Sequence, residues 1–101
     1  MSSTSVTPDL QSANEIIDLA SRAVGKGLRQ LAAIGGADKH QVLAYDLAHA
    51  ASAVETARSL LDYGAKGVHE GLITCAFTAD MAHELMTRLI GREALWGLEL
   101  N

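Results

Sequence analysis

Apolar residues recur along the first third of the chain at alternating spacings of three and four residues. This spacing places them on one face of an α-helix. Thr7 is expected to cap the helix and Pro8 to take its first position, while Gly35-Gly36 ends it. The apolar positions are Leu10, Ala13, Ile17, Ala20, Val24, Gly27 or Leu28, Leu31 and Ile34. The pattern predicts a helix of about seven turns with one buried face.

Two glycines lie inside this first pattern, at Gly25 and Gly27. Each costs about 1 kcal/mol relative to alanine in a helix. We interpret them as points of close contact with a neighbouring helix, in preference to a break near Lys26.

Two more helices follow. Asp38 and Gln41 have the spacing of a capping box, which predicts a helix start, and Gly64 is expected to end that helix in the left-handed conformation. Its apolar stripe comprises Leu43, Leu47, Ala50, Val54, Ala57 and Leu61. The third helix is expected from Gly67 or Val68 to Gly91 or Gly97, with a stripe at Val68, Leu72, Cys75, Ala79, Ala82, Met86 and Leu89.

Together these patterns predict an all-α fold, an antiparallel up-down bundle of three long helices with room for a short fourth over Arg92–Leu98. A polar tail at residues 1–6 is expected to be disordered, and residues 7–101 to form one domain. The chain has 101 residues, 49% of them hydrophobic, enough for one core. Three helices with stripes this long are expected to leave apolar surface uncovered, and five residues are candidates for covering it by self-association or against a larger subunit. They are Met81, Leu85, Trp96, Leu98 and Leu100.

Charge and composition exclude several classes of protein. The net charge is -4 and no basic cluster is present, which argues against a nucleic-acid partner. The sequence has neither a basic, apolar leader nor a run long enough to span a bilayer, so we expect a cytoplasmic protein without a membrane partner. The single Cys75 is expected to be a small buried hydrophobe.

The sharpest chemical pattern is a pair of Asp-x-x-His motifs, Asp46 with His49 and Asp80 with His83. Helical residues three apart share a face, so two such pairs could bind two metal ions, as Glu-x-x-His pairs do in di-iron carboxylate bundles. That di-metal bundle is a minor alternative, because the other helix has few further carboxylates. We favour a structural role in which each Asp, at the edge of the bundle, accepts a hydrogen bond from its His. We therefore assign no metal ligand and no catalytic residue.

Two segments resemble a known family. Tyr45-Asp46-Leu47-Ala48-His49-Ala50-Ala51, continued by Ala57–Ala65, resembles the helix after the leucine-alanine-aspartate-methionine-alanine segment of the acyl-CoA dehydrogenases. Phe77–Ala82 resembles the next helix of that family. The resemblance extends over Gln41–Gly97 and implies the family's C-terminal four-helix-bundle domain, which helps to bind FAD and acyl-CoA and builds the oligomer.

The flavin motifs of the family are replaced here. Leu28–Ala32 stands near the position of the arginine-x-x-phenylalanine-glycine segment, Gly91–Leu95 at the glutamine-x-x-glycine-glycine loop, and Asp38 at a flavin-associated glutamine. The family's catalytic glutamate would lie beyond Asn101. The resemblance thus implies an accessory or partial subunit of a flavin-dependent oxidoreductase complex, a homo-oligomer or bound to a larger dehydrogenase subunit. FAD is expected only in such a complex and no cofactor in the isolated chain; cofactor-binding residues stay unassigned. The alternative is a non-catalytic helical oligomerisation module.

Overall fold

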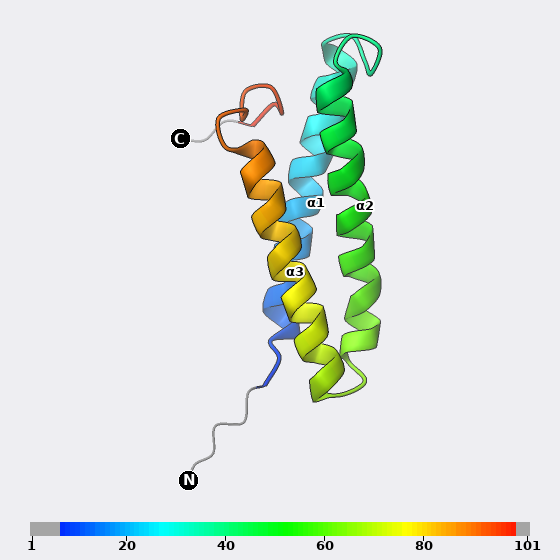
Figure 1. Ribbon diagram of the computed structural model, residues 1–101, viewed down its shortest axis with the longest axis vertical. Coiled ribbons are helices and arrows are strands. Elements are labelled where there is room, and N and C mark those ends of the chain that lie inside the picture. Colours follow the sequence, from blue (N-terminus) through cyan, green and yellow to red (C-terminus); the bar gives the residue numbers. More distant parts are fainter. Residues whose placement is uncertain (1–6, 99–101) are drawn as a thin grey trace.

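Three helices form the fold of the computed structural model, which describes residues 7–98. They are α1 (Leu10–Ala33), α2 (Gln41–Gly64) and α3 (Val68–Leu89). α1 and α3 run in one direction and α2 in the other (Figure 1). The predicted all-α antiparallel bundle is confirmed, and residues 7–98 contain no strand. The predicted tail at 1–6 and Leu100 lie outside the described residues. None of the three helices combines the length and the apolar character that crossing a membrane requires.

α1 begins two residues later than predicted. The capping residue is Asp9, not Thr7, and its carboxylate accepts hydrogen bonds from the Ser12 backbone N–H at 2.9 Å and the Ser12 hydroxyl at 2.7 Å. These bonds lower the pKa of Asp9 below its ordinary value. The cap is therefore complete above the usual titration range of aspartate and is lost as the pH falls through the lowered pKa.

The predicted end and buried face of α1 are confirmed. Gly35 and Gly36 have φ values of 117° and 83°, in the left-handed region that glycine favours, and stop the helix. Gly27 lies on the buried stripe, whereas Leu28 is 46% exposed. A Cβ atom at Gly27 would lie 2.5 Å from Leu47 Cδ2, so Gly27 does allow close helix contact. Gly25 does not, since only the Arg29 side chain of its own helix lies within 4 Å.

α2 ends at Gly64 as predicted but begins at Gln41, after the start that the capping box predicted. No capping box forms: the residue before the helix is His40, whose side chain makes no cap bond and instead lies with Nε2 3.0 Å from the Ile34 carbonyl oxygen. The expected left-handed Gly64 is also wrong, because Gly64 ends the helix itself and Ala65 after it is right-handed. Gly64 is buried and a Cβ there would lie 2.6 Å from Thr74 Oγ1. Its small size serves contact with α3.

The predicted buried face of α3 is wrong by about one residue step, or about 100° around the helix. The residues that are buried are Gly71, Thr74, Thr78, Met81, Leu85 and Leu89. Of the predicted stripe, Val68 is 60% and Met86 50% exposed. The two buried threonines have their hydroxyls satisfied: Thr74 donates to the Leu60 carbonyl of α2 at 2.9 Å, and Thr78 to the Thr74 carbonyl at 2.9 Å.

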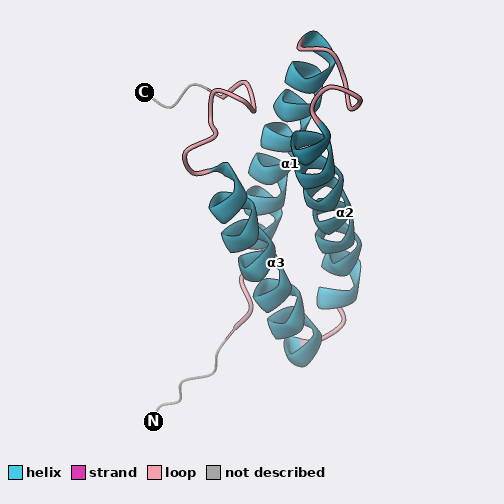
Figure 2. Ribbon diagram, turned by 45° about the horizontal axis from the view of Figure 1, so that its top comes forward, coloured by secondary structure: helices cyan, strands magenta, loops and turns pink. Residues whose placement is uncertain are grey.

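The chain after α3 forms turns and not the short fourth helix predicted over Arg92–Leu98. Gly91, with φ 84°, ends α3, and the Trp96 and Leu98 amides donate to the carbonyls of Arg92 and Glu93. This segment lies at the C-terminal end of α3 (Figure 2). It carries Trp96 into the core, where the side chain is fully buried. Met81, Leu85 and Trp96 are thus core residues, and the prediction that they cover a partner surface is wrong.

Candidate functional site

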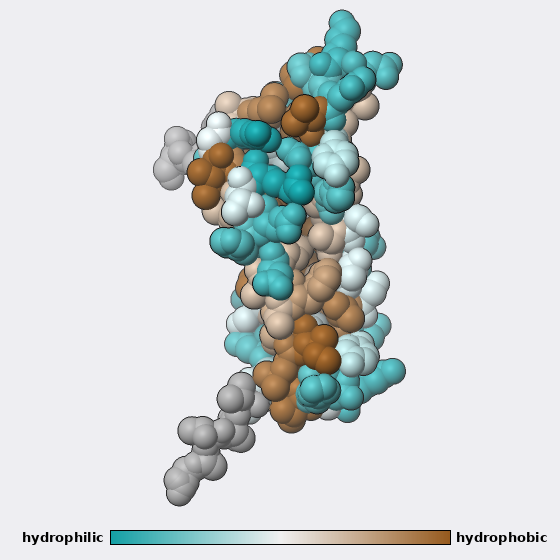
Figure 3. All heavy atoms as spheres, viewed as in Figure 1, coloured by the Kyte–Doolittle hydropathy of each residue, from teal (hydrophilic) through white to brown (hydrophobic). Residues whose placement is uncertain are grey.

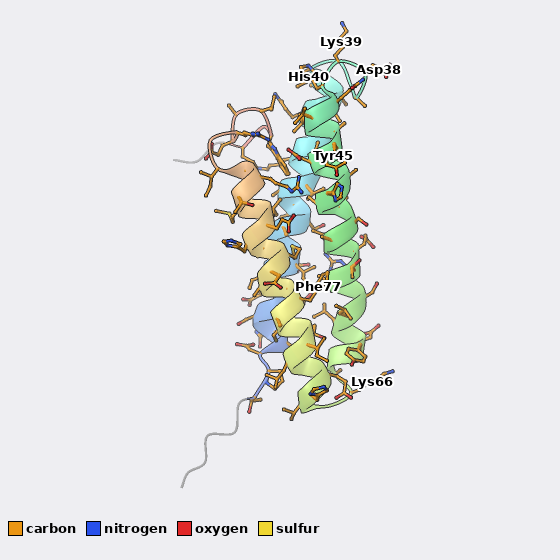
Figure 4. The ribbon with its side chains drawn as sticks, in the orientation of Figure 1. Asp38, Lys39, His40, Tyr45, Lys66 and Phe77 are labelled. Atoms are coloured by element: carbon orange, nitrogen blue, oxygen red, sulfur yellow. The ribbon has the colours of Figure 1, made fainter. Side chains whose placement is uncertain are left out.

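A hollow of about 290 Å³ lies between α2 and α3. We call it the α2–α3 groove. Its floor is apolar and its rim carries ionisable side chains. The floor residues are Ala50, Ala53, Phe77, Met81 and Leu85, and the rim residues are His49, Asp80, Glu84 and Arg88. Figure 4 shows Phe77 at mid-height, on the side of α3 that faces α2.

Helical spacing explains why these residues meet. On α3, Phe77, Asp80 and Glu84 follow one another at three and four residues, so they share one flank of the helix. Opposite them, α2 presents Ala50 and Ala53, whose small side chains leave space that larger residues would fill. The groove is therefore a consequence of alanine on α2 facing long side chains on α3.

An ion-pair network closes one end of the groove. Asp46 is only 5% exposed, and its two carboxylate oxygens accept hydrogen bonds from Arg88 at 2.5 Å and Arg92 at 3.0 Å. Arg88 also donates to Glu84 at 3.2 Å. The hydrogen bonds to Glu84 and Asp46 raise the pKa of Arg88 above its ordinary value. The network ties α2 to the end of α3 and to the turn that follows it.

The predicted partner of Asp46 is thus wrong. His49 makes no bond to Asp46; it is exposed, and its ring packs against Tyr45 with the centroids 4.3 Å apart. Asp46 was expected at the edge of the bundle but is buried. Its charge is compensated by two arginines that lie 42 and 46 residues later in the sequence. A buried carboxylate requires such partners.

The structure brings only part of the two Asp-x-x-His motifs together. His49 and Asp80 both lie on the rim of the α2–α3 groove, while Asp46 is bound by arginines and His83 is exposed outside the lining. Within residues 7–98, no three His, Cys, Asp or Glu side chains are placed to hold one metal ion. The motifs do not converge on one point.

Replacing Asp46 with asparagine is expected to lower the free energy of unfolding by about 1–3 kcal/mol, the usual range for losing a charged hydrogen-bond partner. The full cost of breaking a buried ion pair is not expected, because the Arg88 and Arg92 side chains are 27% and 51% exposed and can turn to water. Urea denaturation measures the change. Asp62→Asn is the matched control on the exposed side of α2. Equal effects of the two variants would contradict the structural role of the network.

A second apolar surface lies on the other flank of α3. A hollow of about 300 Å³ between α1 and α3 is lined by apolar side chains that include Pro8, Ile16, Leu72 and Ala79. Hydrophobic surface also gathers over the N-terminal half of α3 on the side drawn in Figure 3. We call the surface around the hollow between α1 and α3 the α1–α3 face and define it by its apolar residues. Ile16, Leu72, Cys75 and Ala79 line the hollow, and the helical spacing of α1 and α3 continues the face to Leu19, Val68, Ala82 and Met86.

Comparisons of the chain with protein-family models, with curated proteins and with solved structures find no match. The resemblance to the acyl-CoA dehydrogenases stays a prediction from the residues quoted above.

Proposed function

We propose that this chain is a non-catalytic helical interaction module that pairs with a second copy through the α1–α3 face. One observation carries the proposal. The stripe from Val68 to Met86 has the alternating four- and three-residue spacing that helices use to pack against other helices, yet it lies at the surface of the bundle. An apolar face of this kind is typical of a protein contact surface.

The order of residues along this stripe favours a two-fold contact. Its spacing reads the same from both ends, and its centre lies midway between Cys75 and Ala79. In an antiparallel pair of α3 helices, Val68 therefore meets Met86 and Leu72 meets Ala82 of the second copy. The small central residues let the helices approach closely, and a two-fold contact uses the same patch on both copies.

Light scattering at micromolar concentration is expected to give twice the chain mass of 10.6 kDa. Leu72→Glu should weaken the dimer at least about tenfold, because the contact loses the burial of a leucine side chain in each copy. Val42→Glu on α2 is the matched control: Val42 is 68% exposed and lies outside the α1–α3 face.

Cys75 supplies an independent test because it is the one cysteine of the chain and is only partly buried. In the antiparallel pair the two copies of Cys75 are separated by about 6 Å along the helix axis, so a short bismaleimide should link them. A mass of 10.6 kDa for the unmodified chain, or equal loss of dimer in both glutamate variants, would refute the proposal.

The second candidate function is the accessory subunit of an acyl-CoA dehydrogenase-like complex. The segments that resemble the family fall on neighbouring antiparallel helices, which favours this function. Tyr45–Ala51 and Ala57–Ala65 lie along α2 and at its end, and Phe77–Ala82 lies on α3. A flavin absorbance band in protein purified together with a dehydrogenase chain would support this function over simple self-association. The isolated chain with added FAD should stay colourless after dialysis.

A further inference from the structure

The α2–α3 groove has the shape of a small-molecule site. Ligand pockets have volumes of roughly 300–1,000 Å³ and combine an apolar lining with a few polar groups. The groove, at about 290 Å³, lies just below that range and is large enough only for a small ligand. Its floor of two alanines, Phe77, Met81 and Leu85 suits a short hydrocarbon chain.

The charges of the rim select the polar end of such a ligand. The positive charge of Arg88 is already bound by Asp46 and Glu84, so it is not free for an anion. Asp80, one turn before Glu84 on the same flank of α3, forms no ion pair within residues 7–98. The charge of Glu84 is shared with Arg88, so a ligand carboxylate would meet the like charge of Asp80, whereas a ligand cation would meet an opposite one.

Phe77 adds to this preference. It lies one turn before Asp80 and lines the same groove. The face of an aromatic ring attracts a cation within about 6 Å of its centroid. An ammonium group placed between Phe77 and Asp80 gains from both, and its alkyl chain can then lie along Ala50 and Ala53.

We propose that the α2–α3 groove binds a small aliphatic amine, with the ammonium group at Asp80 and the alkyl chain on the apolar floor. This site is separate from the α1–α3 face, because Phe77 and Asp80 lie on one flank of α3 and Leu72 and Cys75 on the other. Loss of self-association therefore leaves the amine site in place.

Isothermal titration calorimetry at pH 7 and low salt, with octylammonium, octanol and octanoate as probes, tests the proposal. Octylammonium is expected to bind at least about tenfold more tightly than octanoate, with the neutral octanol between them. Raising the salt concentration should weaken octylammonium but not octanol, because screening acts only on the charged probe.

Three variants locate the site. Asp80→Asn is expected to weaken octylammonium about three- to fivefold, the size of one exposed ion pair, and to leave octanol unchanged. Glu55→Gln on α2 removes an exposed carboxylate that does not line the groove. It should change the affinity of neither octylammonium nor octanol. Ala53→Leu fills the hollow and should abolish binding of both probes, with helical content checked by circular dichroism.

Amide chemical shifts give a readout that does not depend on any variant folding. Octylammonium should perturb Ala53, Phe77 and Asp80 and leave Leu72 and Cys75 unaffected. The proposal is overturned if octanoate binds as tightly as octylammonium, if Asp80→Asn behaves like Glu55→Gln, or if the perturbed amides lie on the α1–α3 face.

Discussion

Replacing Trp96 with alanine is expected to lower the free energy of unfolding by about 3–5 kcal/mol. The Trp96 side chain is fully buried, and a Cβ at Gly27 would lie 3.1 Å from its Cε3 atom, so it fills the space above that glycine. Alanine would leave a cavity at the point where the C-terminal turn meets α1 and α2. Since a small domain is stable by only about 5–15 kcal/mol, this loss removes much of the total.

Urea denaturation followed by circular dichroism measures the change. Leu95→Ala is the matched control, because Leu95 is the preceding residue in the same turn and is 39% exposed; it should cost under about 1 kcal/mol. Trp96→Phe should fall between the two. It loses less volume and removes an indole N–H that is buried without a hydrogen-bond partner. Equal stability of Trp96→Ala and Leu95→Ala would show that the turn is not part of the core.

The helices could be predicted from local signals alone. The end of α1 follows from Gly35-Gly36, which both take the left-handed conformation, and the end of α2 from Gly64. The caps were less predictable, because neighbouring residues compete for them. Thr7 and Asp9 are both residue types that cap helices. Asp9 is the cap in the structure, because its carboxylate accepts a hydrogen bond from Ser12.

The buried face of α3 could not be predicted by spacing because the helix carries two stripes with the same period. Apolar content alone favoured the stripe with Leu72 and Met86. The stripe that is buried contains Gly71, Thr74 and Thr78, which look less suited to a core. Gly64 permits close contact of α2 with Thr74 of α3, Gly71 leaves room for Pro8, and the Thr74 hydroxyl donates to the α2 backbone. The useful signal was that these small residues share the helical spacing of Met81 and Leu85. Choosing the more hydrophobic stripe overlooks that signal.

The sequence predicted only some of the residues of the candidate site. His49 and Asp80 were singled out and do share the α2–α3 groove. The partners of Asp46 were missed, because Arg88 and Arg92 are more than forty residues away in the chain and no local pattern links them. A signal did exist: Arg88 continues the spacing of the buried Met81 and Leu85, and an arginine on a buried stripe requires an acidic partner.

Replacing Leu47 with aspartate is expected to unfold the chain. Leu47 is fully buried on α2, and its side chain occupies the space that Gly27 leaves open on α1. Aspartate at this position would lose the apolar burial of leucine and place an unpaired carboxylate in the core. Few single substitutions lower the free energy of unfolding by more than about 4–5 kcal/mol, and burying an unpaired charge is one of them. Such a loss approaches the whole stability of a small domain.

Far-UV circular dichroism of the purified variant at 25 °C measures the outcome, with loss of the helical signal expected. Ala48→Asp is the matched control, since Ala48 is the next residue of α2 and is exposed. It adds the same charge one residue further along the helix and should cost under about 1 kcal/mol, mostly from the lower helix propensity of aspartate. A folded Leu47→Asp protein with a cooperative melt like that of Ala48→Asp would mean that α2 does not pack on Gly27, and the core described here would have to be abandoned.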